Sequence, residues 1–266
     1  MSNNDTIRKT LTVAFLLCLV CSVIVSVASV WLKPLQIANK SLDFKRNILA
    51  AAGLLEKGVP IDRQFEQITV KLVDLDTGKF TDAVDAEEYD QRKAAKDPDL
   101  SDALSQDKDI AKISRREKYA KVYLVENKSK TNRSNGLNDI QTIILPIKGY
   151  GLWSTLYGFI ALESDLNTIA GLGFYEHAET PGLGGEVDNP IWKASWEGKK
   201  VYRDDGQLAL TVIKGKVTEA TKDKVYTVDG LSGATLTTRG VDNLIEFWMG
   251  DMGYGKFLSN LKSGGV

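Results

Sequence analysis

The stretch LTVAFLLCLVCSVIVSVASVWL, Leu11–Leu32, decides how this chain is organised, because it holds no charged residue over 22 positions. At about 1.5 Å per residue, a helix of this length reaches roughly 33 Å, enough to cross a bilayer core of about 30 Å. A cleaved signal peptide is the alternative, and Ser26-Val27-Ala28 loosely resembles a cleavage site. The apolar run exceeds the roughly 15 residues of a signal core, so we expect an uncleaved transmembrane helix.

Basic residues flank this run on both sides, with Arg8 and Lys9 before it and Lys33 and Lys40 after it. The positive-inside rule therefore does not orient the span by itself. A short tail, residues 1–10, is easily retained in the cytoplasm. We expect residues 33–266 to form one domain on the outer side of the membrane.

Both cysteines, Cys18 and Cys21, lie inside the apolar run. Their i, i+3 spacing puts them on one helix face, where they could share a metal ion with a partner subunit. A free cysteine more often acts as a small hydrophobic side chain that packs against its neighbours, and we expect that role here. The rest of the chain has no cysteine, which excludes disulfides and thiolate-bound clusters there. The 34 basic and 35 acidic residues balance, so no nucleic-acid partner is expected.

Six stretches rich in β-branched and aromatic residues predict strands. QITVKLVDLDTGKF alternates through Ile68, Val70 and Leu72 and reaches a hairpin turn at Asp76–Gly78. Four candidates follow in quick succession, over 119–127, 140–149, 156–164 and 168–177, and QLALTVIKGKV, 207–217, supplies another. Short strands at this spacing predict an α+β fold, a single domain with a mixed or antiparallel sheet flanked by helices.

Three further segments complete the plan. SLDFKRNILAAAGLLEKG, 41–58, predicts a short helix, and the charged insert 81–118 predicts a solvated helix or loop rather than a binding site. VDGLSGATLTTRGVDNLIEFW, 228–248, predicts a helix whose start is capped by Thr237 or Thr238. Its apolar face, at i, i+3, i+4 and i+7, consists of Val241, Leu244, Ile245 and Trp248.

The usual catalytic groups are sparse in this sequence. His177 is the single histidine, and no G-x-S-x-G elbow accompanies it, which argues against a hydrolase triad. No phosphate-binding G-x-x-x-x-G-K-[ST] loop and no complete dinucleotide fingerprint occur. We therefore expect no catalytic acid-base set and no metal site.

Three segments instead combine glycines, aromatic rings and hydroxyls: GYGLWSTLYG (149–158), GFYEHAETPGLGG (173–185) and VDGLSGATLTTRG (228–240). Glycines let a backbone approach a flat ligand, and Trp153 and Tyr157 could stack on it. Hydroxyls and the N–H groups at a helix start could hold a phosphate. Taken alone, such loops are more often turns, and a tryptophan is more often core.

DGLSGAT, Asp229–Thr235, resembles the D-x-x-[ST]-G-A-T flavinylation motif of the FMN-binding domain family, whose last threonine takes FMN through a phosphoester bond. EHAETPGLG at 176–184, GLWSTLYG at 151–158 and the N-terminal span extend the resemblance to the C subunits of bacterial Na+-translocating NADH:quinone reductases. The G subunit of the related Rnf electron-transport complex shares much of this plan and is the alternative.

The resemblance implies that Thr235 carries covalent FMN at the start of the last helix. A separate flavin transferase, using FAD, would read the residues before it: Asp229, Ser232, Gly233 and Ala234. The implied ring contacts are Trp153, Thr155 and Leu183, with His177, Glu179 and Thr180 as further candidates. For His177, a hydrogen bond that shapes its loop is favoured over proton donation.

By the same resemblance, the chain is one flavoprotein subunit of a translocase that oxidises NADH, reduces ubiquinone and exports sodium. It would relay single electrons towards quinone beside the other subunits of the complex, with sodium transport coupled elsewhere. A membrane-tethered domain that binds a ligand without redox function is the alternative from another class.

Overall fold

The computed structural model describes residues 6–126 and 140–265, in two units that meet between Phe44 and Lys45. Helix α1, Ile7–Ala51, runs through the predicted span, and Pro34 lies inside it without ending it. In the described part of the chain, α1 is the one helix long and apolar enough to cross a membrane. The predicted separate helix over 41–58 is wrong, because its first turns continue α1. Residues 1–5 of the predicted cytoplasmic tail lie outside the residues that the structure describes.

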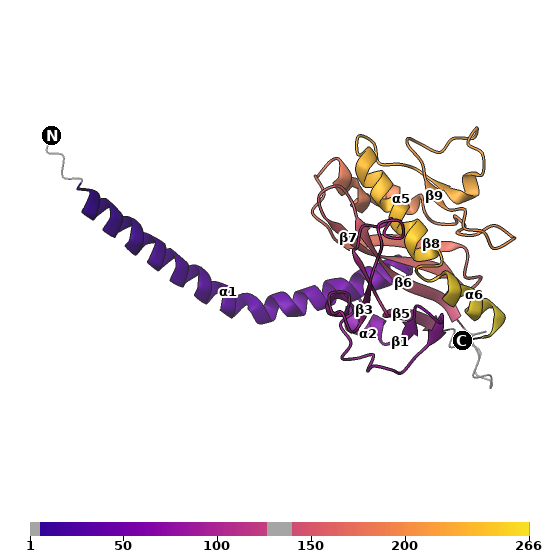
Figure 1. Ribbon diagram of the computed structural model, residues 1–266, viewed down its shortest axis with the longest axis horizontal. Helices are drawn as coiled ribbons and strands as arrows, with labels where there is room; N and C mark the ends of the chain where they lie inside the picture. The colour runs from indigo at the N-terminus through magenta and orange to yellow at the C-terminus, as the bar shows by residue number, and fades with distance from the viewer. Residues whose placement is uncertain (1–5, 127–139, 266) are drawn as a thin grey trace. The chain divides into compact units, whose positions relative to one another are not determined.

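The second unit, from Lys45 onward, is built on a six-stranded sheet with the order β2-β1-β5-β6-β7-β8 (Figure 1). Every neighbouring pair is antiparallel, which confirms the predicted α+β fold. The strands are β1 (Ile68–Asp74), β2 (Lys79–Phe80), β5 (Tyr119–Glu126), β6 (Ile140–Tyr150), β7 (Thr155–Glu163) and β8 (Ile169–Glu176). Asn127, the predicted end of one strand, lies outside the described residues.

The strand predicted over 207–217 is wrong for most of its length. Leu210 and Val212 are buried as the alternation requires, but the N–H groups of Ala209 and Leu210 both bond to the carbonyl of Val201 instead of a sheet neighbour. Only β9 (Thr211–Val212) is a strand, and it pairs in parallel with β10 (Thr227–Val228) in a small separate sheet.

Helices α5 (Thr235–Met249) and α6 (Gly255–Ser263) cover one face of the main sheet (Figure 1). The predicted apolar face of α5 is confirmed, since Val241, Leu244, Ile245 and Trp248 are all fully buried, each burial being worth about 1.5–3 kcal/mol. A Cβ on Gly149 of β6 would lie 2.5 Å from the Leu244 Cβ. The helix therefore packs against the sheet closely enough to require glycine there.

The last turn of α1 and the short helix α2 (Ile61–Phe65) cover the opposite face. Ile48 and Leu49 are fully buried. The ring centroids of Phe65 and Tyr123 lie 6.3 Å apart, in an edge-to-face arrangement. A Cβ on Gly171 would lie 2.4 Å from the carbonyl oxygen of Ala51, so β8 and the end of α1 are in direct contact.

Most of the charged insert 81–118 is exposed or half-buried, but part of it packs against this body, which the prediction of a solvated segment did not include. It contains α3 (Gln91–Ala94), β3 (Ser101–Ala103) and β4 (Arg115–Glu117). Glu117 is fully buried and pairs with Lys148 of β6 at 2.5 Å. Arg92 donates from its two terminal guanidinium nitrogens to the two carboxylate oxygens of Glu176 of β8, at 2.8 and 2.7 Å. Composition misled the prediction because these charges are paired with charges in the sheet.

Three short helices connect the remaining segments, namely η2 (Gly184–Asp188), α4 (Pro190–Ala194) and η3 (Lys224–Tyr226). The side chain of Asn189 caps α4 by accepting from the N–H of Ile191 at 2.9 Å. The first two of these helices directly follow the predicted loop 176–184, and they fix its far end.

Candidate functional site

The carboxylate of Glu179 lies at the centre of the predicted site and is buried, with 5% exposure. Its Oε1 accepts from three consecutive backbone N–H groups, those of Leu152, Trp153 and Ser154, at 3.1, 2.9 and 3.2 Å. One carboxylate oxygen therefore gathers the loop between β6 and β7. This joins the 149–158 and 173–185 segments, which the sequence had marked as rich in glycines and aromatic rings.

The second oxygen of the same carboxylate reaches the third segment. Thr237 on α5 is fully buried and donates its hydroxyl to Oε2 of Glu179 at 2.7 Å. Burial alone would raise the pKa of the Glu179 carboxyl, but the hydrogen bonds from Trp153, Thr237, Ser154 and Leu152 outweigh it and hold that pKa below its ordinary value. Glu179 is therefore a carboxylate at neutral pH.

Three glycines leave the space that this arrangement needs. A Cβ on Gly151 would lie 2.6 Å from Oε1 of Glu179, and one on Gly184 would lie 2.5 Å from the Thr237 hydroxyl. On α5, a Cβ on Gly240 would lie 2.5 Å from the carbonyl oxygen of Tyr150. The sequence marked these glycines as places where the backbone could lie close to a ligand. In the structure, these three instead allow two segments of the protein to pack closely against each other.

His177 and Ser154 hold the same loops from the side. The Nε2 of His177 lies 2.8 Å from a carboxylate oxygen of Asp188, and its Nδ1 accepts from the backbone N–H of Glu179 at 3.2 Å. The hydroxyl of Ser154 accepts from the backbone N–H of Ala178 at 2.7 Å. Both ring nitrogens of His177 therefore bond within the protein, one to Asp188 and one to its own loop.

The segment Asp229–Thr235 leads into α5, which begins at Thr235. Gly233 has a φ of 74°, the left-handed conformation that glycine adopts without strain. Asp229 accepts from the backbone N–H of Val217 at 2.7 Å, and its carbonyl accepts from the indole of Trp192 at 2.7 Å. Asp229 therefore fixes the position of the segment, while Ser232 and Gly233 are exposed.

The predicted cap of this helix is wrong. The N-cap position is Ala234, which makes no side-chain hydrogen bond to the helix. Thr237 faces Glu179, and Thr238 accepts from the N–H of Leu231 at 3.0 Å while donating to the carbonyl of Ala234 at 3.0 Å. Both hydroxyls bond inside the protein, so within residues 6–126 and 140–265 the N–H groups of the first turn of α5 have no side-chain cap.

Thr235 is exposed, and the three marked segments also expose large apolar side chains. Trp153, Leu183 and Leu236 are 65%, 45% and 53% exposed. The side chain of Leu183 would meet a Cβ on Gly233 at 3.2 Å, so the loop 176–184 reaches the segment before Thr235. Thr155, the first residue of β7, is half-buried and pairs with Tyr150, whereas Thr180 is exposed and its carbonyl accepts from the N–H groups of Leu183 and Gly185.

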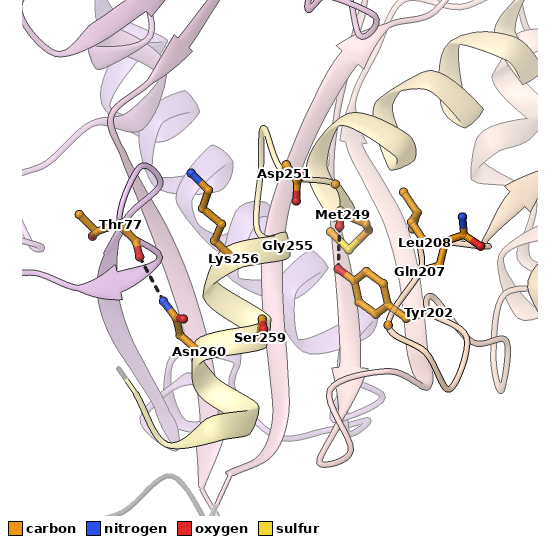
Figure 2. A pocket seen from close by; sticks show the side chains of 12 residues that line it. Thr77, Tyr202, Gln207, Leu208, Met249, Asp251, Gly255, Lys256, Ser259 and Asn260 are labelled. Atoms are coloured by element: carbon orange, nitrogen blue, oxygen red, sulfur yellow. Dashed lines mark hydrogen bonds between the residues drawn. The ribbon is translucent and has the colours of Figure 1, made fainter.

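A separate cavity of about 570 Å³ lies at the other end of α5, beside Met249 (Figure 2). Its walls come from the turns near Thr77 and Gln207 and from α6. The hydroxyl of Tyr202 donates to the Met249 carbonyl at 2.6 Å, and the amide of Asn260 donates to the Thr77 carbonyl at 3.1 Å. About 20 Å of helix, at 1.5 Å per residue, separates this cavity from Thr235. It is therefore not part of the predicted flavin site.

Sequence reasoning missed the residues that assemble the site, notably Ser154, Thr237 and the glycines at 151, 184 and 240. They lie in the three marked segments, but the pattern of those segments does not show that they bond to or pack closely against other parts of the protein. Across residues 6–126 and 140–265, no three His, Cys, Asp or Glu side chains gather in a way that could hold a metal ion.

Comparisons with known proteins agree with this arrangement. Residues 151–250 match the family model of the FMN-binding domain. The chain is 54% identical to the C subunit of the Na(+)-translocating NADH-quinone reductase of Pseudomonas aeruginosa, over 99% of each chain. It is 46% identical to the corresponding reductase subunit of Vibrio campbellii, over 100% of this chain and 99% of the relative.

Solved structures give the same result. The crystal structure of Shewanella oneidensis NqrC superposes with a TM-score of 0.75 at 37% identity, covering 85% of this chain and 99% of that one. The C subunit from Parabacteroides distasonis follows with a TM-score of 0.64 at 27% identity, over 86% and 97% of the two chains. The predicted resemblance is thereby confirmed. The chain belongs to the C-subunit family of the Na+-translocating NADH-quinone reductases, which are ion-translocating oxidoreductase complexes, and it contains an FMN-binding domain that residues 151–250 match.

Proposed function

We propose that Thr235 carries FMN through a phosphoester bond made by a flavin transferase from FAD. In that reaction the Thr235 hydroxyl loses its proton, its Oγ bonds to the phosphorus of the FMN moiety, and AMP leaves. The exposure of the hydroxyls is the observation that carries this proposal. Thr235 is exposed at the first position of α5, whereas Thr237 and Thr238 are 0% and 5% exposed.

The residues around Thr235 suit a phosphate. The first turn of α5 has no side-chain cap, and uncapped N–H groups at a helix start favour an anion by about 0.3–1 kcal/mol at a surface site. Arg239 is exposed and lies four positions after Thr235, which puts its guanidinium on the same face of the helix. Gly233, with its positive φ, leaves room beside Leu183 for the transferase.

FMN, when bound, supplies one-electron redox chemistry. The chain's own residues would bind and shield it, with Trp153, Thr155 and Leu183 beside the ring and Thr180 at the exposed edge of the loop. Asp229, Ser232, Gly233 and Ala234 would form the sequence read by the transferase. His177 and Glu179 hold the loops, so the domain can serve as an electron relay without an acid-base pair.

We further propose that the domain lies on the periplasmic side, with α1 as its anchor, and relays electrons towards quinone while sodium transport is coupled elsewhere in the complex. The high identity over the full chain to the reductase C subunits favours this complex over the Rnf complex. Copurification with the other reductase subunits from solubilised membranes is the expected result. Copurification with Rnf subunits would contradict it.

The covalent bond is tested by in-gel flavin fluorescence after denaturation, with the transferase and FAD supplied. We expect a fluorescent band from the wild type and from the control Thr77→Ala, an exposed threonine in the turn between β1 and β2 and away from the three segments, and none from Thr235→Ala. A dark wild-type band would favour the ligand-binding domain without redox function. A fluorescent Thr235→Ala band would show that another residue is the acceptor.

A further inference from the structure

We propose that Glu179 and Thr237 form a latch that turns Thr235 outward for flavin attachment, so that Glu179 is a positioning residue and not a contact of the flavin. This inference rests on the proposed function, in which Thr235 is the acceptor. The Glu179–Thr237 latch is the hydrogen bond between the Thr237 hydroxyl and Oε2 of Glu179, at 2.7 Å.

The hydrogen bonds of Glu179 show why it does not face a ligand. Its Oε1 accepts from Leu152, Trp153 and Ser154, and its Oε2 accepts from Thr237. Glu179 and Thr237 are 5% and 0% exposed. Both carboxylate oxygens are thus engaged inside the protein, and the carboxylate connects the loop beside Trp153 to the first turn of α5.

Helix geometry converts this bond into an orientation for Thr235. Successive residues of an α-helix are about 100° apart around the axis, so residues two positions apart lie roughly 200° apart, on nearly opposite sides. A bond that holds Thr237 inward therefore keeps Thr235 outward, as its exposure shows. The end turns of a helix fray most readily, and among the described residues no side chain caps the start of α5. The latch supplies the constraint that a cap would otherwise give.

The close packing around the latch fixes its geometry further. A Cβ on Gly184 would lie 2.5 Å from the Thr237 hydroxyl and 2.7 Å from Oε2 of Glu179. The same loop continues to Leu183, which reaches Gly233 immediately before the motif's last two residues. Loss of the latch would therefore loosen both the acceptor turn and the loop that lies against it.

The test compares Thr237→Val with Thr237→Ser in the purified full-length chain in detergent, with transferase and excess FAD. Valine keeps the shape but lacks the hydroxyl, whereas serine restores it. We expect the kcat of flavin transfer to fall about tenfold or more for valine and to stay within about twofold of wild type for serine, with KM for FAD unchanged. Equal rates for the two variants would overturn the proposal. A valine variant that is unfolded at the assay temperature by circular dichroism would also count against positioning, because the hydroxyl would then act on stability.

A double-mutant cycle identifies the partner. Glu179→Met removes the acceptor of the Thr237 hydroxyl together with the bonds to three backbone N–H groups, so it should slow transfer. Adding Thr237→Val should then slow it little further, because the hydroxyl no longer has a partner to lose. Glu186→Met is the matched control: in the described part of the chain, the Glu186 carboxylate bonds only to the Asn189 side chain, at 2.7 Å, so this variant should transfer at the wild-type rate. Additive losses would overturn the latch. These outcomes differ from a failure of the proposed function itself. In that case the wild type would acquire no covalent flavin, or Thr235→Ala would still acquire it.

Discussion

Gly240→Ala sets a favourable helix propensity against a backbone clash, and the structure determines which is larger. Inside a helix, alanine is favoured over glycine by about 1 kcal/mol. The new Cβ would lie 2.5 Å from the carbonyl oxygen of Tyr150 and 2.9 Å from the Cα of Gly151. These are backbone atoms that cannot rotate away, so we take the upper part of the overpacking range, about 3 kcal/mol. The net expectation is destabilisation by about 2 kcal/mol.

Thermal unfolding of the full-length chain in detergent, followed by circular dichroism, measures this effect. For a domain of this size, 1 kcal/mol corresponds to about 2–4 °C, so we expect a fall in Tm of about 4–8 °C. Gly173→Ala is the control, because a Cβ there meets nothing within 4 Å; its Tm should be unchanged or slightly raised. A Gly240→Ala variant as stable as wild type would refute the close contact between α5 and the β6–β7 loop.

Three further predictions concern charged groups. The folded-state pKa of Glu179 lies below its ordinary value of 4.5. The stabilisation that the Glu179 carboxylate gives the fold is therefore complete above pH 4.5 and is lost as the pH falls towards the folded-state pKa. In Glu179→Gln, the urea midpoint should decline less steeply below about pH 5 than in the wild type. Lys148→Met leaves Glu117 buried without its cation and should cost about 3–5 kcal/mol in urea unfolding, and adding Glu117→Gln should recover part of it. Arg92→Met breaks a salt bridge to Glu176 in which both side chains are more than one-third exposed. It should lower the free energy of unfolding by only about 1 kcal/mol. A loss as large as that of Lys148→Met would contradict the expectation that the more buried ion pair is the costlier one to break.

Local patterns in the sequence were enough to predict the sheet and the last helix. Alternation located β1, runs rich in β-branched and aromatic residues located β5, β6, β7 and β8, and the i, i+3, i+4 pattern located the buried face of α5. The same reasoning failed at 207–217, where the alternate residues are buried but the backbone bonds to Val201. It failed again at the insert 81–118, where a partner far along the chain decides whether a charge is exposed.

Of the candidate site, the sequence revealed the motif and the exposed loop residues but not the contacts that hold them together. The motif Asp229–Thr235 and the exposed Trp153 and Leu183 are visible as a family resemblance. Glu179 was expected as a candidate contact, and its role in holding three segments could not be inferred. It is one of 35 acidic residues, and its bond to Thr237 joins residues 58 positions apart. The cap prediction failed for the same reason, because a threonine near a helix start can bond inward to a distant carboxylate.

Peptide mass spectrometry tests the central claim most directly. Trypsin releases the peptide between Lys224 and Arg239, which contains Ser232, Thr235 and Thr237. In protein matured with the transferase and FAD, we predict that this peptide is heavier by FMN less one water, and that fragmentation assigns the added mass to Thr235. An unmodified peptide, or a mass located on Ser232 or Thr237, would contradict the account.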